Sequence, residues 1–186
     1  MKQGKGEEQK MDKKKILVVV DMQNDFINGS LGTGEAQAIV ETAVSAIEAF
    51  EGRIYVTMDT HQSNYLETAE GKKLPVVHCV RETDGWHLNE RIMTALSQKD
   101  YTVIEKGTFG STRLVEEIAR VGTQEELEIE CFGLCTDICV VSNVLLIKAS
   151  FPEAKITVRA DCCAGVTPET HEAALTTMKM CQIEMG

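Results

Sequence analysis

Four titratable side chains in this 186-residue sequence come at the ends of short runs of β-forming residues. They are Asp21, Asp59, Lys106 and Asp161. One acid at such a place is typical of a turn or a helix cap. Because parallel strands present their carboxyl ends at one edge of a sheet, four charged groups there indicate a site for acid–base or nucleophilic chemistry.

Cys139 is the candidate nucleophile. It follows two good N-cap residues, Thr136 and Asp137, so we expect it in the first turn of an apolar helix, where free amide donors favour a thiolate. An unperturbed thiol is only about 3% ionised at pH 7. Lys106 could add positive charge and Asp21 could take the proton. The alternative is a cysteine packed between sheet and helix.

The segment after Asp59 contains residue types that bind metals. His61 lies two positions on, and Glu67, Glu70 and His78 follow in a loop-like stretch. Mixed oxygen and nitrogen donors of this kind suit Zn²⁺, Mn²⁺ or Fe²⁺. The alternative interpretation is a turn residue at 59 and a surface histidine at 61.

Strand-like and helix-like segments alternate along the chain. The strands are predicted at 16–20, 54–58, 101–105, 127–132 and 155–159, with a short last strand at 181–184. The helices are predicted at 35–50, 88–96, 112–121, 138–149 and 168–180, the last with Thr167 as N-cap and Pro168 in its first turn. This order predicts a three-layer α/β/α sandwich with a mostly parallel, Rossmann-like sheet of about six strands.

Composition excludes several classes of protein. The formal net charge of −10 argues against nucleic acid as a partner, and no apolar run is long enough to span a membrane. Seven cysteines, an odd number, without a secretory signal indicate a reduced, cytoplasmic chain. We expect a flexible polar tail over residues 1–14 and a single domain over 15–186.

Three motifs together resemble the isochorismatase-like cysteine hydrolases. They are VDMQNDF at 20–26, EK at 105–106 and GLCTDICV at 133–140, and the resemblance covers nearly all of the chain after residue 14. It implies a catalytic triad of Asp21, Lys106 and Cys139. It also implies a cis peptide bond before Cys135 and an oxyanion hole formed by the backbone N–H groups of Cys135 and Cys139. From the residues alone, Cys135 could instead be the second thiol of a redox pair.

Within that family, Asp59, His61 and a later His78 resemble the nicotinamidase and pyrazinamidase branch, which binds a divalent metal. The usual second histidine is missing here, and Glu70 lies at a similar distance from His61. The resemblance therefore implies four ligands, Asp59, His61, Glu70 and His78, with zinc as the first choice and manganese or iron as alternatives. It also implies a homo-oligomer and a role in NAD salvage.

The predicted reaction is hydrolysis of nicotinamide to nicotinate and ammonia through a thioester on Cys139. Phe26, Trp86 and Phe109 are the predicted substrate-pocket residues. One alternative is another amidohydrolase of the family, acting on a carbamoyl or ureido compound such as N-carbamoylsarcosine or ureidoacrylate. Isochorismatase proper is disfavoured because that branch lacks the nucleophilic cysteine. Other classes are a phospho-acceptor domain, which would give Cys139 no role, and a non-catalytic thiol- or metal-binding protein.

Overall fold

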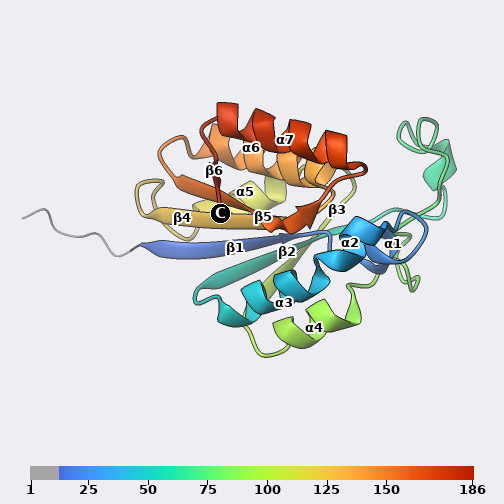
Figure 1. Ribbon diagram of the computed structural model, residues 1–186, viewed down its shortest axis with the longest axis horizontal. Coiled ribbons are helices and arrows are strands. Elements are labelled where there is room, and N and C mark those ends of the chain that lie inside the picture. The colour runs from blue at the N-terminus through green and yellow to red at the C-terminus, as the bar shows by residue number, and fades with distance from the viewer. Residues whose placement is uncertain (1–12) are drawn as a thin grey trace, which may run out of the picture.

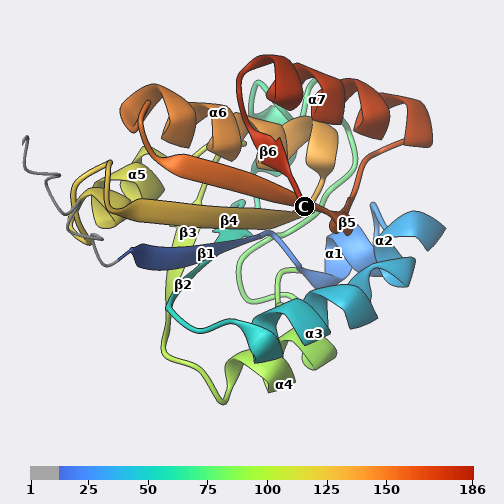
Figure 2. The same cartoon turned by 60° about the vertical axis from the view of Figure 1, so that its left-hand side comes forward.

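The protein is a six-stranded parallel sheet covered by helices on both faces. The computed structural model describes residues 13–186. Figures 1 and 2 show α3 and α4 on one face of the sheet and α5, α6 and α7 on the other. The predicted three-layer α/β/α architecture is therefore confirmed. The tail predicted at 1–14 falls outside the described residues except for its last two, and Lys14 is already the first residue of β1.

All strand pairs are parallel, and the sheet has the order β3-β2-β1-β4-β5-β6. The chain first forms β1, β2 and β3, which extend the sheet to one side, and then crosses back to add β4, β5 and β6 on the other side of β1. The strands are β1 (Lys14–Val20), β2 (Arg53–Asp59), β3 (Tyr101–Lys106), β4 (Leu127–Leu134), β5 (Lys155–Ala164) and β6 (Glu184–Met185). The strand order changes direction at β1 and β4, and at such a point an open α/β sheet has its crevice for ligands.

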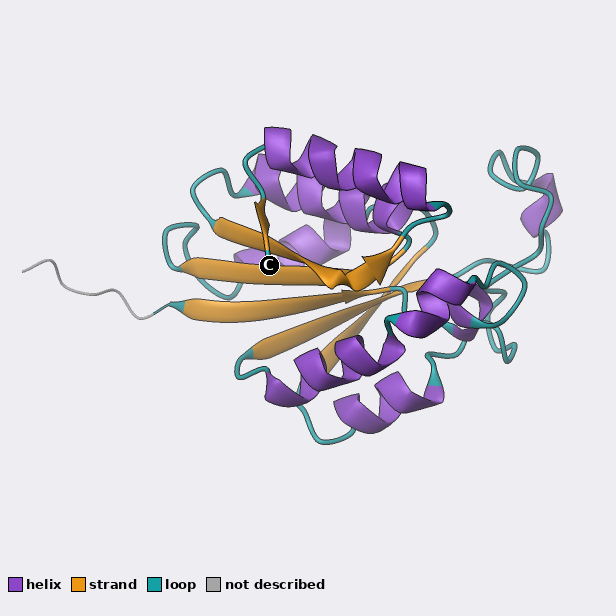
Figure 3. Ribbon diagram, viewed as in Figure 1, coloured by secondary structure: helices purple, strands orange, loops and turns teal. Residues whose placement is uncertain are grey.

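Helices and helical turns connect the strands, as Figure 3 shows by colour. The α-helices are α1 (Asn24–Ile27), α2 (Gly34–Ala38), α3 (Val40–Ala49), α4 (Glu90–Leu96), α5 (Thr112–Ala119), α6 (Val141–Ser150) and α7 (Pro168–Met180). A 3-10 turn, η1 (Tyr65–Glu67), and a π-helical turn, η2 (Thr136–Val140), complete the set. None of the helices in residues 13–186 combines the length and the apolar character that crossing a bilayer requires.

Local sequence signals explain most of these elements. Residues 16–20 of β1 are completely buried β-branched and leucine side chains, as expected for a strand covered on both faces. At α7 the predicted N-cap is confirmed, because Thr167 accepts a hydrogen bond from the N–H of Thr170 and Pro168 opens the helix. The helix predicted at 35–50 is divided at Ile39 into α2 and α3. Neither α1 nor η1 was predicted.

Asp161 was wrongly predicted to end its strand at the active edge of the sheet. β5 continues to Ala164, and Asp161 is an exposed residue within it that pairs with Arg159 at 3.4 Å. The strand extends because its pairing with β4 resumes at Gly133–Cys163 after a register shift. Asp161 therefore has no part in the candidate site.

The close approach of β1 and β4 depends on Gly133. Its φ is +134°, and a Cβ there would lie 2.0 Å from the carbonyl oxygen of Val20. We expect Gly133→Ala to lower the free energy of unfolding by about 3 kcal/mol or more, because both strain and overlap are imposed in the middle of the sheet. Gly34→Ala is the matched control, since nothing lies within 4 Å of its Cβ. Denaturant titration checks this, and equal stability of the two variants would contradict it.

Candidate active site

The carboxyl ends of β1, β2 and β3 bring three charged residues together. Asp21 directly follows β1 in a left-handed conformation, with φ of 48°. Asp59 and Lys106 are the last residues of β2 and β3 and lie opposite each other in the parallel register. All three are buried, at 0–5% exposure. The sequence predicted that these three residues would meet at one edge of the sheet, and the structure places them there.

The Lys106 ammonium contacts both of the residues predicted to join it in a triad. Its Nζ lies 2.6 Å from Asp21 Oδ2 and 3.5 Å from Cys139 Sγ. Asp59 Oδ1 is a third neighbour, also at 3.5 Å. The hydroxyl of Thr57 donates to Asp21 Oδ1 at 2.6 Å and so orients the carboxylate from the neighbouring strand. One carboxylate, one ammonium and one sulfur therefore share a single buried cluster.

The electrostatics of this cluster favour a resting thiol beside a base. Burial raises the pKa of the Cys139 thiol well above its ordinary value, and the negative charge of Asp21 raises it further, although the Lys106 charge opposes this. Burial also raises the pKa of Asp21 above 3.8, although the Lys106 charge opposes this. For Lys106, burial lowers the pKa, but the negative charges of Asp21 and Asp59 raise it, and the net shift is upward, so the ammonium stays charged. Because the net shift favours the protonated sulfur, a base is needed to form the thiolate, and Asp21 is the residue predicted for that role.

Cys139 does not occupy the first turn of an ordinary α-helix. It lies in the π-helical turn η2, and α6 begins two residues later. The N-cap position is taken by Cys135 rather than by either predicted cap, and the carbonyl of Cys135 accepts hydrogen bonds from Ile138 and Val140. A π-helical turn inside a helical segment is often found at functional sites.

The Leu134–Cys135 peptide bond is cis, as the motif resemblance implied. Cys135 and Cys139 both line one cavity of about 260 Å³. All seven cysteines of the chain are free thiols, so no disulfide joins these two.

The cavity wall is mainly apolar. Phe26 and Phe109 line it, as predicted, together with the metal-type residues Asp59, Glu70 and His78. Trp86 was wrongly placed there: it lies outside the lining, and its indole N–H donates to Thr60 Oγ1 at 2.9 Å. The other lining residues are Leu31, Thr33, Ala36, Leu74, Leu134, Ile138, Gly165 and Val166.

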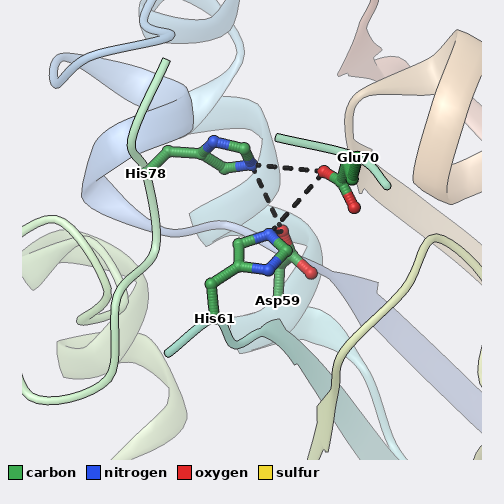
Figure 4. Close-up of side chains that lie close together, drawn as sticks. All are labelled: Asp59, His61, Glu70 and His78. Carbon is green, nitrogen blue, oxygen red and sulfur yellow. Dashed lines mark ion pairs between the residues drawn. The ribbon is translucent and has the colours of Figure 1, made fainter. Parts of the chain in front are cut away.

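The four predicted metal ligands converge on one point (Figure 4), and one of them, Asp59, also contacts Lys106. One ligand atom from each of Asp59, His61, Glu70 and His78 lies within 4.8 Å of all the others. His61 Nε2 is 3.0 Å from Asp59 Oδ2 and 3.7 Å from Glu70 Oε1. His78 Nε2 is 3.6 Å from Asp59 Oδ2 and 3.7 Å from Glu70 Oε1. A tetrahedral zinc site has ligand-to-ligand separations of about 3.4 Å, which these distances approach.

Two further details fit a divalent metal. His61 Nε2 is buried and has no hydrogen-bond partner although a carboxylate oxygen lies beside it. His78 uses Nδ1 to bond the Val76 carbonyl at 2.8 Å, which leaves Nε2 directed at the cluster. Burial raises the pKa of Asp59, but the neighbouring His61 and His78 and the Lys106 charge outweigh this and bring it below its ordinary value, so the carboxylate is anionic. The donor set therefore suits zinc or a similar ion.

Gln23 is a site residue that the sequence interpretation missed. Its side chain is completely buried and bonds the backbone of Asp59 on both sides, with Nε2 donating to the carbonyl and Oε1 accepting from the N–H. Nε2 also donates to the Trp86 carbonyl at 2.8 Å. It holds Asp59 between the ammonium and the histidines. Gln23 belongs to the first motif, which could have marked it as a site residue. The motif does not indicate, however, that its side chain bonds the backbone of Asp59.

The chain belongs to the isochorismatase domain family, whose model matches residues 15–185. It is a hydrolase of that family, and the predicted family resemblance is confirmed.

Individual relatives agree with this assignment. Nicotinamidase from Saccharomyces cerevisiae is 30% identical over 122 residues, which cover 50% of this chain and 56% of the yeast protein, so the match spans about half of that relative. The crystal structure of nicotinamidase/pyrazinamidase PncA from Bacillus subtilis superimposes with a TM-score of 0.80 at 25% identity, covering 93% of this chain and 99% of that one. The pyrazinamidase of Pyrococcus horikoshii, solved in complex with zinc, gives 0.76 at 26% identity over 93% and 98%.

Proposed function

We propose that this protein deamidates nicotinamide, and the related pyrazinamide, to the carboxylic acid and ammonia. The observation that carries the proposal is the contact of one ammonium, on Lys106, with both a buried carboxylate and a buried thiol at the wall of a small apolar cavity. The names of the relatives supply the substrate class. The cavity volume of about 260 Å³ suits a single small ring, since pockets for larger ligands span roughly 300–1,000 Å³.

In the proposed acylation, Asp21 takes the proton of the Cys139 thiol while the sulfur attacks the amide carbon. The electrons of the C=O bond move to oxygen, and the resulting oxyanion meets the backbone N–H groups of Cys135 and Cys139. When the oxyanion collapses, the C–N bond breaks and Asp21 returns its proton to the departing nitrogen, which leaves as ammonia. The positive charge of Lys106 stabilises the Asp21 carboxylate before the proton transfer and the Cys139 thiolate after it.

In the proposed deacylation, Asp21 takes a proton from water as the water oxygen attacks the thioester carbon. The C–S bond then breaks, the carboxylic acid leaves and the proton restores the Cys139 thiol. Phe26 and Phe109 exclude water from the ring of the substrate. A metal held by Asp59, His61, Glu70 and His78 would supply a Lewis-acidic centre for a ring nitrogen or a bound water.

The proposal is tested by ammonia release from a panel of amides. Nicotinamide and pyrazinamide are expected to be hydrolysed, and N-carbamoylsarcosine and ureidoacrylate are expected to be poor substrates. The second pair carries a carboxylate, and the residues lining the described cavity include no arginine and no lysine to pair with it. Preferential hydrolysis of the carbamoyl or ureido compounds would favour the rival amidohydrolase instead.

Metal binding is checked separately from activity. We expect the chelator-treated protein to bind one Zn²⁺ per chain, measured by calorimetry. His78→Ala is expected to weaken binding by about 10²-fold or more, because it removes one of four buried ligands. Chelated enzyme should lose amide hydrolysis, with recovery on adding Zn²⁺, Mn²⁺ or Fe²⁺. His87→Ala is the matched control, since His87 is an exposed histidine outside the cluster, and equal zinc affinity of the two variants would contradict the assignment.

Three broader expectations stay predictions. They are the homo-oligomer, the cytoplasmic location with a role in NAD salvage, and the division into a tail over 1–14 and one hydrolase domain over 15–186.

A further inference from the structure

Asn143 is a buried amide that the proposed mechanism does not use. It lies on α6, one turn after Cys139, and is 1% exposed. Its Nδ2 donates to the carbonyl of Cys139 at 2.8 Å and to the carbonyl of Phe109 at 3.0 Å. Its Oδ1 accepts the N–H of Ser111 at 3.0 Å. Both donors and the acceptor of this side chain are therefore committed to backbone groups of two separate segments.

The segment that Asn143 reaches, residues 107–110, has few other anchors. It connects Lys106 to Ser111, the N-cap of α5, and has the sequence Gly-Thr-Phe-Gly. Within the described part of the chain, no backbone-to-backbone hydrogen bond holds these four residues. Two glycines make such a segment costly to order in one conformation. The two bonds from Asn143 to Phe109 and Ser111 are thus its principal restraints.

This segment carries a wall of the cavity. Phe109 lines the cavity together with Cys139, yet is 41% exposed, so packing alone restrains its ring weakly. Its carbonyl is held by the same amide nitrogen that holds the carbonyl of Cys139. Asn143 therefore links the apolar wall and the nucleophile turn through one rigid planar group.

We propose that Asn143 is a positioning residue that fixes the distance between the Phe109 wall and the Cys139 sulfur, and thereby determines how tightly an aromatic amide is held. The inference rests on the proposed amidase function for its kinetic consequence, but not for its structural one. Asn143 does not touch the substrate. Its loss releases residues 107–110, so the effect is expected mainly on substrate binding, with a smaller effect on the chemical step.

The test uses Asn143→Leu, which keeps the approximate shape and introduces no charge, and Asn143→Ser, which keeps one donor if the leucine variant folds poorly. Ser150→Ala, an exposed position on the same helix, is the matched control. Hydrogen exchange of the Ser111 amide, whose N–H donates to Asn143 Oδ1, is measured first by NMR. We expect exchange there to accelerate at least tenfold in either Asn143 variant, while amides of β1 and β4 stay unchanged. The control should leave all amides unchanged.

The kinetic arm measures KM and kcat for nicotinamide in a double-mutant cycle with Phe109→Ala. We expect Asn143→Leu to raise KM by about tenfold in the wild-type background, with a smaller fall in kcat. In the Phe109→Ala background the same change should raise KM less than twofold, because the wall it positions is gone. Unchanged exchange at the Ser111 amide, or equal effects on KM in both backgrounds, would overturn the proposal. If the wild-type chain releases no ammonia, the proposed function fails. The exchange result then still shows whether Asn143 restrains the segment 107–110.

Discussion

Replacing Cys139 by alanine is expected to reduce ammonia release by about 10⁴-fold or more while leaving the fold intact. The reason is that no other group in the buried cluster can form the thioester: the cluster's other members are the Lys106 ammonium, which contacts the sulfur, and the two carboxylates that contact Lys106. Loss of one small buried side chain costs about 1–2 kcal/mol of stability, which thermal unfolding will resolve from inactivation. The rate of ammonia release at saturating nicotinamide is the measurement.

Cys135→Ala is the matched control for this prediction. Cys135 lines the same cavity four residues earlier, but the proposed mechanism uses only its backbone N–H, so this variant should keep most of the activity. An inactive Cys135→Ala together with an active Cys139→Ala would reverse the assignment of the nucleophile.

Asp21→Asn is expected to lower kcat/KM by about 10²–10⁴-fold, because the asparagine cannot accept the thiol proton. Its amide oxygen can still accept the hydrogen bond from Thr57, so the side chain can keep its orientation. The change also removes a charge from beside the buried Lys106, and we expect a loss of stability that unfolding measurements should report alongside the rates.

Thr57→Val is the matched control for Asp21→Asn. It removes the hydroxyl that donates to the carboxylate and leaves the base in place, so its effect should be at most about tenfold. The pH profile gives a second readout. Burial raises the pKa of Asp21, and the base must be deprotonated to act, so wild-type kcat/KM should fall as pH decreases through a value above the ordinary 3.8. An Asp21→Asn variant with wild-type rates would exclude this carboxylate as the base.

The strands and their shared edge could be predicted from the sequence because each has a short-range signature. Residues 16–20 are a continuous run of buried strand-forming side chains, and the parallel arrangement follows from the alternation with helices. Once the order was set, Asp59 and Lys106 had to meet as the last residues of adjacent strands. Cys139 could be found because it follows the next strand at the same edge.

Other features depend on contacts that a local pattern does not contain. The end of β5 was misjudged because residues 160–164 are weak strand formers, and their pairing with β4 resumes only after a bulge. The pKa of Cys139 likewise depends on contacts beyond its own helical turn, because burial and the Asp21 carboxylate raise it against the effect expected from helix-end amides.

Gln23 was missed for a related reason. Its role lies in bonding the backbone of Asp59, thirty-six positions away along the chain. A buried glutamine has no type-specific chemistry from which such a partner could be deduced. Trp86 does not line the cavity, because an aromatic residue type predicts apolar contact but not its direction, and the indole N–H of Trp86 donates to Thr60.

The most direct test of covalent catalysis is the mass of the peptide containing Cys139, taken from enzyme quenched in acid while it hydrolyses nicotinamide. We predict that the Cys139 sulfur carries the acyl group of the substrate and that enzyme quenched without substrate does not. An acyl group found on Cys135 or on any other residue instead would contradict the assignment of Cys139 as the nucleophile.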